Sequence, residues 1–189
     1  MSAFIYARRT FSSERENMEL LDLRFSEKTL KILKGMAGQV FEKYRCDPSI
    51  FHPVYLLPVG IYAGGKKTDV LEWIFREAEA EEIHSSRPAV VQEDHALQKE
   101  IKEVRIINEK KTLSRCGKAE YRVYLTKAVR FIFEKGYLQI RKPVYFSPFL
   151  NLEDDGEECR EWEKLDNLPE EWEETYDVNT ETEILAYKK

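Results

Sequence analysis

The stretch "KAEYRVYLTKAVRFIFEK", residues 118–135, carries two hydrophobic periodicities at once. Polar and apolar side chains alternate in "YRVYLT", as they do in a half-buried strand. Four side chains also recur at helical spacing: Tyr121, Leu125, Ala128 and Ile132. Because Gly136 follows at the position of a left-handed helix cap, the pattern favours a helix over at least residues 126–135.

Two further helices are predicted upstream of this stretch. The clearest covers residues 26–45, where Ser26 is a natural N-cap and the apolar side chains fall on one face. Another begins at Asp69, where a capping-box pattern precedes a helical stripe. The sequence around Asp94, "QEDHALQKE", also looks helical.

Besides a short first strand over residues 5–11, extended chain is predicted in three places. Residues 51–63 form an apolar run, in which Pro53 and Pro58 each delete a ladder donor and so favour a sheet edge or a bulge. Residues 103–111 and 137–150 are the other expected strands. Together these elements predict an α+β fold, with a small mixed or antiparallel sheet packed against about three helices.

The composition is that of a globular chain. It has 189 residues, of which 42% are hydrophobic and 12% aromatic, enough to bury a core. No apolar run approaches the length of a membrane-spanning helix. The three cysteines, Cys46, Cys116 and Cys159, are far apart and odd in number, as expected in a reducing compartment. The cytoplasm is therefore the expected location.

The charge is distributed unevenly along the chain. Residues 1–150 hold 26 Lys and Arg against 20 Asp and Glu, whereas residues 151–189 hold 4 against 15. We expect a basic globular domain over residues 1–150 and an acidic, partly ordered extension over residues 151–189 that docks on a basic surface. That surface is either the chain's own or a partner's.

A phosphate-binding loop is nearly present in "GIYAGGKKT", but we interpret it as a turn. Gly60, Gly65 and Lys66 match the spacing, yet Lys67 occupies the position of the metal-binding hydroxyl, and an ammonium group cannot ligate a metal. Gly64 and Gly65 would then supply the positive φ angles of the turn. A metal-free anion site at Lys66 and Lys67 is the alternative.

A second motif resembles nucleases of the restriction-enzyme type. Glu109-Lys110-Lys111 follows an apolar strand and matches their (D/E)-x-K signature, and Asp94 lies upstream. The resemblance implies that Asp94 and Glu109 would share a divalent metal ion while Lys111 stabilises phosphate charge. The simpler interpretation is a solvated strand end. Isolated histidines and scattered serines offer no other catalytic set, and neither a cofactor nor a resident metal is expected.

The segment from residue 99 to residue 142 is strongly basic, with 13 Lys and Arg against five Glu. Aromatic side chains are interleaved with the cations, which is typical of a surface that binds nucleic acid. The simpler interpretation is that the aromatic side chains belong to the core and the charges to a solvated face. The candidate contacts are Lys110, Lys111, Arg115, Lys118, Arg122, Arg130, Arg141 and Lys142.

Large apolar side chains interrupt the acidic extension: Trp162, Leu165, Leu168, Trp172 and Tyr176. Aromatic anchors among carboxylates are typical of a protein-binding segment. We therefore expect a non-enzymatic interaction protein, such as an inhibitor, an immunity-type protein or an adaptor, that recognises a charged partner surface. Nucleic-acid binding through the basic segment is the alternative, and the metal-dependent nuclease is a more remote one.

Overall fold

The computed structural model describes residues 18–48, 56–69, 93–142, 151–155 and 175–189. This part of the chain contains one helix and ten strands. In chain order they are β1 (Glu19–Leu23), α1 (Glu27–Lys34), β2 (Val40–Pro48), β3 (Leu56–Ala63), β4 (Lys66–Asp69), β5 (Glu93–Glu100), β6 (Glu103–Arg115), β7 (Lys118–Ile132), β8 (Tyr137–Arg141), β9 (Asn151–Asp155) and β10 (Asp177–Lys188). The predicted α+β fold with about three helices is therefore wrong, because the described chain is mostly strands.

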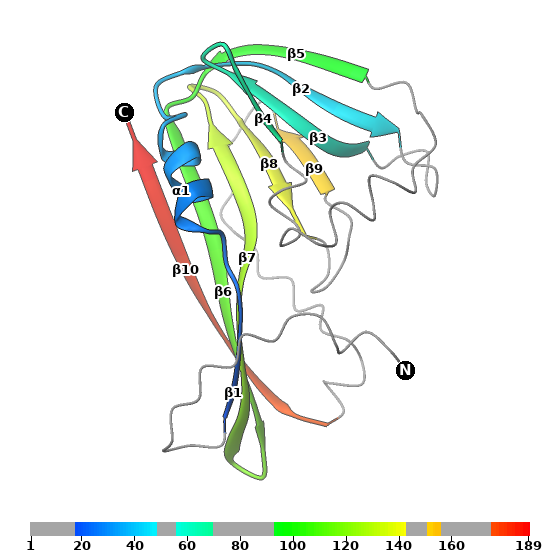
Figure 1. Cartoon of the computed structure of the whole chain (residues 1–189), viewed down its shortest axis with the longest axis vertical. Helices are drawn as coiled ribbons and strands as arrows, with labels where there is room; N and C mark the ends of the chain where they lie inside the picture. The colour runs from blue at the N-terminus through cyan, green and yellow to red at the C-terminus, as the bar shows by residue number, and fades with distance from the viewer. Residues whose placement is uncertain (1–17, 49–55, 70–92, 143–150, 156–174) are drawn as a thin grey trace.

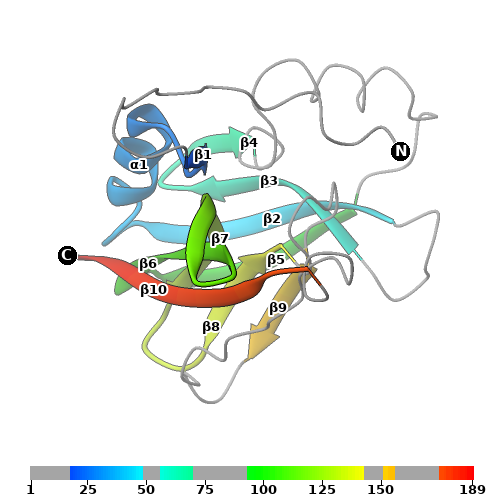
Figure 2. The same cartoon turned by 90° about the horizontal axis from the view of Figure 1, so that it is seen from below.

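The strands form two sheets. One has six strands in the order β10-β6-β7-β8-β9, with β1 pairing in parallel alongside β7, and the other has the order β4-β3-β2-β5. The other strand pairs are antiparallel. Figure 1 shows β6, β7 and β10 running along the long axis of the molecule, with the four-stranded sheet at one end and the β6–β7 turn at the other. Figure 2 shows the two sheets as layers.

Residues 118–135 form the whole of strand β7 and part of the turn after it, not the expected helix. Thr126 pairs with Asn108 and Ala128 pairs with Ile107, so Lys127 is an extra residue that makes a β-bulge. Across the bulge, side chains on the same face are three residues apart instead of two. Tyr121, Leu125, Ala128 and Ile132 thus share one face of a bulged strand and imitate a helical stripe.

The expected helix over residues 26–45 is confirmed only in its first half. The Ser26 side chain accepts a hydrogen bond from the Thr29 backbone N–H, so Ser26 is the N-cap. Gly35 caps the helix C-terminus, and Gly38, with φ of 82°, turns the chain away. Residues 40–48 then continue as β2, because the helix cannot continue through a residue in the left-handed region.

The positions of the turns were predicted more accurately than those of the helices. Gly64 and Gly65 have φ angles of 57° and 73°, as expected, but they join β3 to β4 and not a strand to a helix. Pro58 lies where β3 pairs with β2 beside a register shift, which fits the expected bulge. The residues around Asp94 form strand β5, so the helix expected there is wrong. The helix expected after Asp69 and the strand expected over residues 5–11 lie outside the described residues.

Apolar side chains form two clusters on opposite faces of the six-stranded sheet. The larger fills the space between the two sheets and includes Phe41, Ile61 and Phe131, all fully buried. The smaller contains Leu113, Val123 and Leu125 and lies near the β6–β7 turn. The bulge at Lys127 explains the change of face in β7, because it shifts the alternation by one residue. Among the described residues, no helix is long and apolar enough to cross a membrane.

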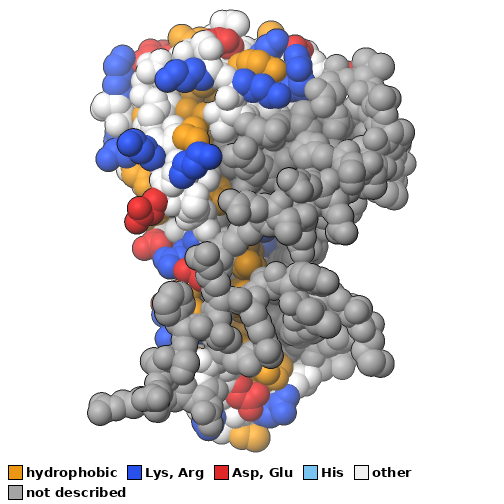
Figure 3. Space-filling view, viewed as in Figure 1, with side chains coloured by type: hydrophobic (Ala, Val, Ile, Leu, Met, Phe, Trp, Pro, Cys, Tyr) orange, Lys and Arg blue, Asp and Glu red, His pale blue; other side chains and the backbone are white. Residues whose placement is uncertain are grey.

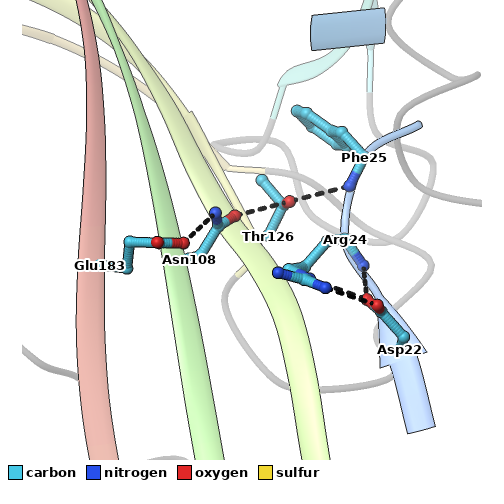
Figure 4. Close-up of polar contacts among 6 residues, drawn as sticks. All are labelled: Asp22, Arg24, Phe25, Asn108, Thr126 and Glu183. Carbon is cyan, nitrogen blue, oxygen red and sulfur yellow. Dashed lines mark hydrogen bonds and ion pairs between the residues drawn. The ribbon is translucent and has the colours of Figure 1, made fainter. Parts of the chain in front are cut away.

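A chain of polar contacts crosses the six-stranded sheet at the level of the bulge (Figure 4). The Asn108 side chain donates to Glu183 of β10 at 3.1 Å and accepts from the Thr126 hydroxyl at 2.9 Å. The Thr126 hydroxyl in turn accepts from the Phe25 backbone N–H at 3.0 Å. These contacts tie β10, β6, β7 and the segment before α1 together where the backbone ladder is interrupted.

Candidate functional site

A group of charged and aromatic side chains lies on the outer face of the four-stranded sheet. We call it the Tyr62 cluster; its members are Lys43, Arg45, Tyr62, Lys67 and Asp94. Tyr62 pairs with Lys43 of β2 on one side and with Lys67 of β4 on the other, and Asp94 of β5 pairs with Arg45. The alternate residues, such as Tyr44 and Ile61, point into the core.

The cations of β2 gather around the Tyr62 ring. Lys43 Nζ lies 4.6 Å from the ring centroid and Arg45 Cζ lies 5.5 Å from it, both within cation–π range. About a third of each cationic side chain remains accessible to solvent. Figure 3 shows Lys and Arg side chains gathered around hydrophobic ones over β2 and β3. This face therefore combines positive charge with an aromatic platform.

Gly60 and the β3–β4 turn position the remaining cation. A Cβ atom on Gly60 would come within 3.1 Å of Lys67 Cε, so the glycine leaves room for the lysine stem to cross β3. The turn itself is held because the Gly65 N–H donates to Glu42 Oε1 at 2.7 Å. Lys66, the neighbouring lysine of the predicted anion site, is exposed but pairs with Ala63, so it alternates to the other side of β4.

The Asp94 carboxylate bridges Lys43 and Arg45, the two cations of β2. Its Oδ2 accepts from Lys43 Nζ at 2.6 Å, while Arg45 donates to Oδ1 at 2.6 Å and to Oδ2 at 3.0 Å. Hydrogen bonds from Arg45 and then Lys43 hold the pKa of Asp94 well below its usual range. The carboxylate is therefore ionised at neutral pH, and the cluster has a net charge of about +2.

The structure does not bring the nuclease-like residues together. Asp94 lies on the four-stranded sheet with Lys43 and Arg45, whereas Glu109 and Lys111 lie on β6 of the six-stranded sheet. Glu109 and Lys111 are both almost fully buried and share a face of β6 with Leu113. Among the described residues, no three His, Cys, Asp or Glu side chains are close enough to hold a metal ion.

The basic segment also does not form one exposed surface. Lys111, Arg130 and Lys142 are buried, and Lys110 pairs with Glu181 at 3.0 Å. Lys118 is exposed beside the β6–β7 turn. Two other candidates have partners within the sheet: Arg115 Nη2 donates to Tyr176 at 3.1 Å, and Arg141 Nε lies 2.7 Å from Glu153. The last, Arg122, is half-buried on β7.

Arg130 belongs to a polar row that crosses the six-stranded sheet. Its Nε donates to Gln139 Oε1 at 2.8 Å, and the Gln139 amide donates to Glu153 at 2.9 Å. The Arg130 guanidinium also lies 4.4 Å from the centroid of Tyr137. Arg130, Gln139 and Tyr137 are all at least 95% buried, so this row is part of the interior and not an open site.

The described parts of the acidic extension are strands of the six-stranded sheet. Residues 151–155 form β9 beside β8, and residues 177–188 form β10 beside β6. Tyr176 lies under the Arg115 guanidinium at 4.9 Å and packs edge-on against Tyr121 at 5.7 Å. The other predicted partner-binding residues, Trp162, Leu165, Leu168 and Trp172, lie outside the described residues.

The Tyr62 cluster was not predicted from the sequence, because Lys43 and Arg45 fall within the helix expected over residues 26–45. As a strand, "FEKYRC" places these two cations on one face and Tyr44 and Cys46 on the other, which is the signal that could have identified the site. Tyr62 lies in an apolar run that predicts a buried strand, whereas its side chain is half-buried on the outer face of the sheet. Comparison with family models, with curated proteins and with solved structures finds no match for this chain.

Proposed function

We propose that this chain is a non-enzymatic interaction protein, of the inhibitor, immunity or adaptor kind, that recognises an acidic protein surface through the Tyr62 cluster. The observation that carries the proposal is the grouping of Lys43, Arg45 and Lys67 around an aromatic ring on an open sheet face. Tyrosine and arginine are enriched among the side chains that dominate protein interfaces.

Asp94 indicates which ligand chemistry suits the cluster. A carboxylate already lies between Lys43 and Arg45 and is held by both through short hydrogen bonds. A partner's carboxylate would meet the same two donors from the solvent side. This favours an acidic protein over nucleic acid, because Lys43 and Arg45 already lie over the ring on which a base would stack.

The test is binding of a fluorescent polyglutamate peptide, measured by anisotropy at low ionic strength. The double variant Lys43→Ala/Arg45→Ala should lose at least tenfold in affinity, whereas Lys118→Ala, an exposed lysine near the β6–β7 turn, should bind as the wild type does. A labelled single-stranded oligonucleotide serves as the contrasting probe. Equal losses for both variants, or tighter binding of the oligonucleotide, would contradict the proposal.

A further inference from the structure

β10 differs from the other edge strands of the described sheets. β1 and β9 have five residues each, and β4 has four. β5 is longer, but its pairing with β2 is interrupted by a register shift, and Gln98 has φ of 51°. β10 has 12 residues and pairs with β6 without interruption. Proteins usually blunt sheet edges with short strands, bulges or proline, and β10 has none of these features.

The outer side of β10 is accessible. In the part of the chain that the structure describes, β10 pairs with β6 alone, and it lies at the outline of the molecule (Figure 1). Ile184 is 47% exposed, more than any other large hydrophobic side chain of the described core and surface, and Ala186 beside it is exposed as well. A strand that paired with β10 would cover Ile184 and would satisfy the outward-facing N–H and C=O groups.

The charged side chains of β10 indicate which kind of strand would pair with it. Glu181 and Glu183 lie two residues apart on one face of β10, and both are exposed, with Glu181 also paired with Lys110 of β6 at 3.0 Å. Glu183 is held in place by the Asn108 side chain (Figure 4). The opposite face carries Thr182, Ile184 and Ala186. A matching strand has Lys or Arg at alternate positions and apolar side chains between them, since opposite charges across a strand pair stabilise it.

In the registers centred on the acidic pair, a second copy of the chain fits this edge poorly. Two β10 strands related by a twofold axis would pair antiparallel with the same faces aligned. Pairing centred on Thr182 places Glu181 of each copy opposite Glu183 of the other, and pairing centred on either glutamate places that glutamate opposite itself. Like charges directly opposite one another destabilise a sheet, so the acidic pair disfavours self-association in these registers, whereas a basic partner strand would pair with it favourably.

We infer that β10 is an acceptor for an added strand, and that its occupant is an extended, basic segment of another protein, with Lys or Arg alternating with apolar residues. This inference is independent of the Tyr62 cluster, which lies on the other sheet and takes ligands of opposite charge. Backbone pairing would supply much of the affinity, and Glu181 and Glu183 would select the sequence and register.

The experiment uses the whole chain and a short blocked peptide of alternating lysine and valine, with binding followed by anisotropy and by amide hydrogen exchange. We expect binding that slows exchange in β10, and an affinity about tenfold lower for Glu181→Lys/Glu183→Lys. That variant should instead bind the peptide in which glutamate replaces lysine. Glu134→Lys, at an exposed glutamate of the β7–β8 turn, should bind the lysine peptide normally.

Three results would overturn the inference. One is equal binding of a peptide with proline in place of valine, since that peptide keeps the charge but cannot form a ladder. Another is equal affinity in the wild type and the charge-reversed variant. The third is dimerisation of the wild type through β10 in sedimentation, with no peptide binding. If the charge-reversed variant does not fold, Glu183→Gln, which retains an acceptor for Asn108, tests the charge alone.

Discussion

Replacing Asp94 by asparagine should strengthen ligand binding at the Tyr62 cluster. Damage to the site would weaken binding, so the two effects can be told apart. In the proposed interaction, Asp94 would compete with a partner carboxylate for Lys43 and Arg45. Each cation lies 2.6 Å from an oxygen of Asp94. A partner carboxylate bound to the far side of the same cation would therefore lie about 5 Å from the Asp94 carboxylate. One unit of charge at that distance in water corresponds to about a fourfold change in an equilibrium constant.

We therefore expect Asp94→Asn to bind the polyglutamate peptide about fourfold more tightly than the wild type at low salt. The gain should vanish at about 1 M salt, where the screening length falls to about 3 Å. The asparagine is nearly the same size as the aspartate, so the positions of Lys43 and Arg45 should change little. The assay is a salt series of anisotropy titrations on both proteins.

The matched control is Asp177→Asn, which removes an exposed carboxylate from the far end of the molecule, at the start of β10. It changes the net charge of the chain by the same amount without touching the cluster. An equal gain in this control would mean that overall charge, and not the cluster, sets the affinity. Unchanged or weaker binding by Asp94→Asn would refute the argument that Asp94 occupies the ligand's place.

Three further predictions concern the fold. Thr126→Val should lower the free energy of unfolding in urea by about 1–3 kcal/mol, because the partly buried Phe25 N–H loses its acceptor at the buried Thr126 and Asn108 loses a donor, whereas Thr126→Ser should stay near the wild type. Phe131→Ala should cost about 3–5 kcal/mol in the same assay, because Phe131 is fully buried between the sheets. Hydrogen bonds from Lys102 and Lys189 lower the pKa of Glu100, and Arg45 and Lys43 do the same for Asp94. Stability from both carboxylates is thus complete above their unfolded pKa of about 4 and is lost as the pH falls through the lower folded values, so Glu100→Gln should flatten the acid limb of the melting-temperature profile.

Local backbone chemistry was the part of the fold that the sequence revealed best. Ser26 caps a helix and Gly64 and Gly65 make a turn because each depends only on immediate neighbours. The length of the helix was overestimated because apolar side chains continue at helical spacing past Gly38. The apolar side chains after Gly38 belong to β2. Their alternation with polar side chains is recognisable only once the helix is known to end before them.

The wrong prediction of a helix over residues 126–135 is explained by one extra residue in β7. Lys127 shifts the alternation of β7, and the resulting three-residue step between Leu125 and Ala128 is indistinguishable in sequence from a helical step. A bulge depends on what the partner strand offers, here Ile107 and Asn108 of β6, so a window of local sequence cannot reveal it. The Tyr62 cluster was missed for the same reason, since its members come from four strands that only pairing brings together.

β10 also has a consequence for how the polypeptide is made. It is synthesised long after β6 and β7, yet it is the strand that covers the side of β6 facing away from β7. While the ribosome completes the chain, the nascent hairpin of β6 and β7 presents a bare edge of the length that β10 will occupy. A polypeptide truncated before residue 177 would leave that edge of β6 permanently uncovered. Such a product should depend on chaperones or form aggregates.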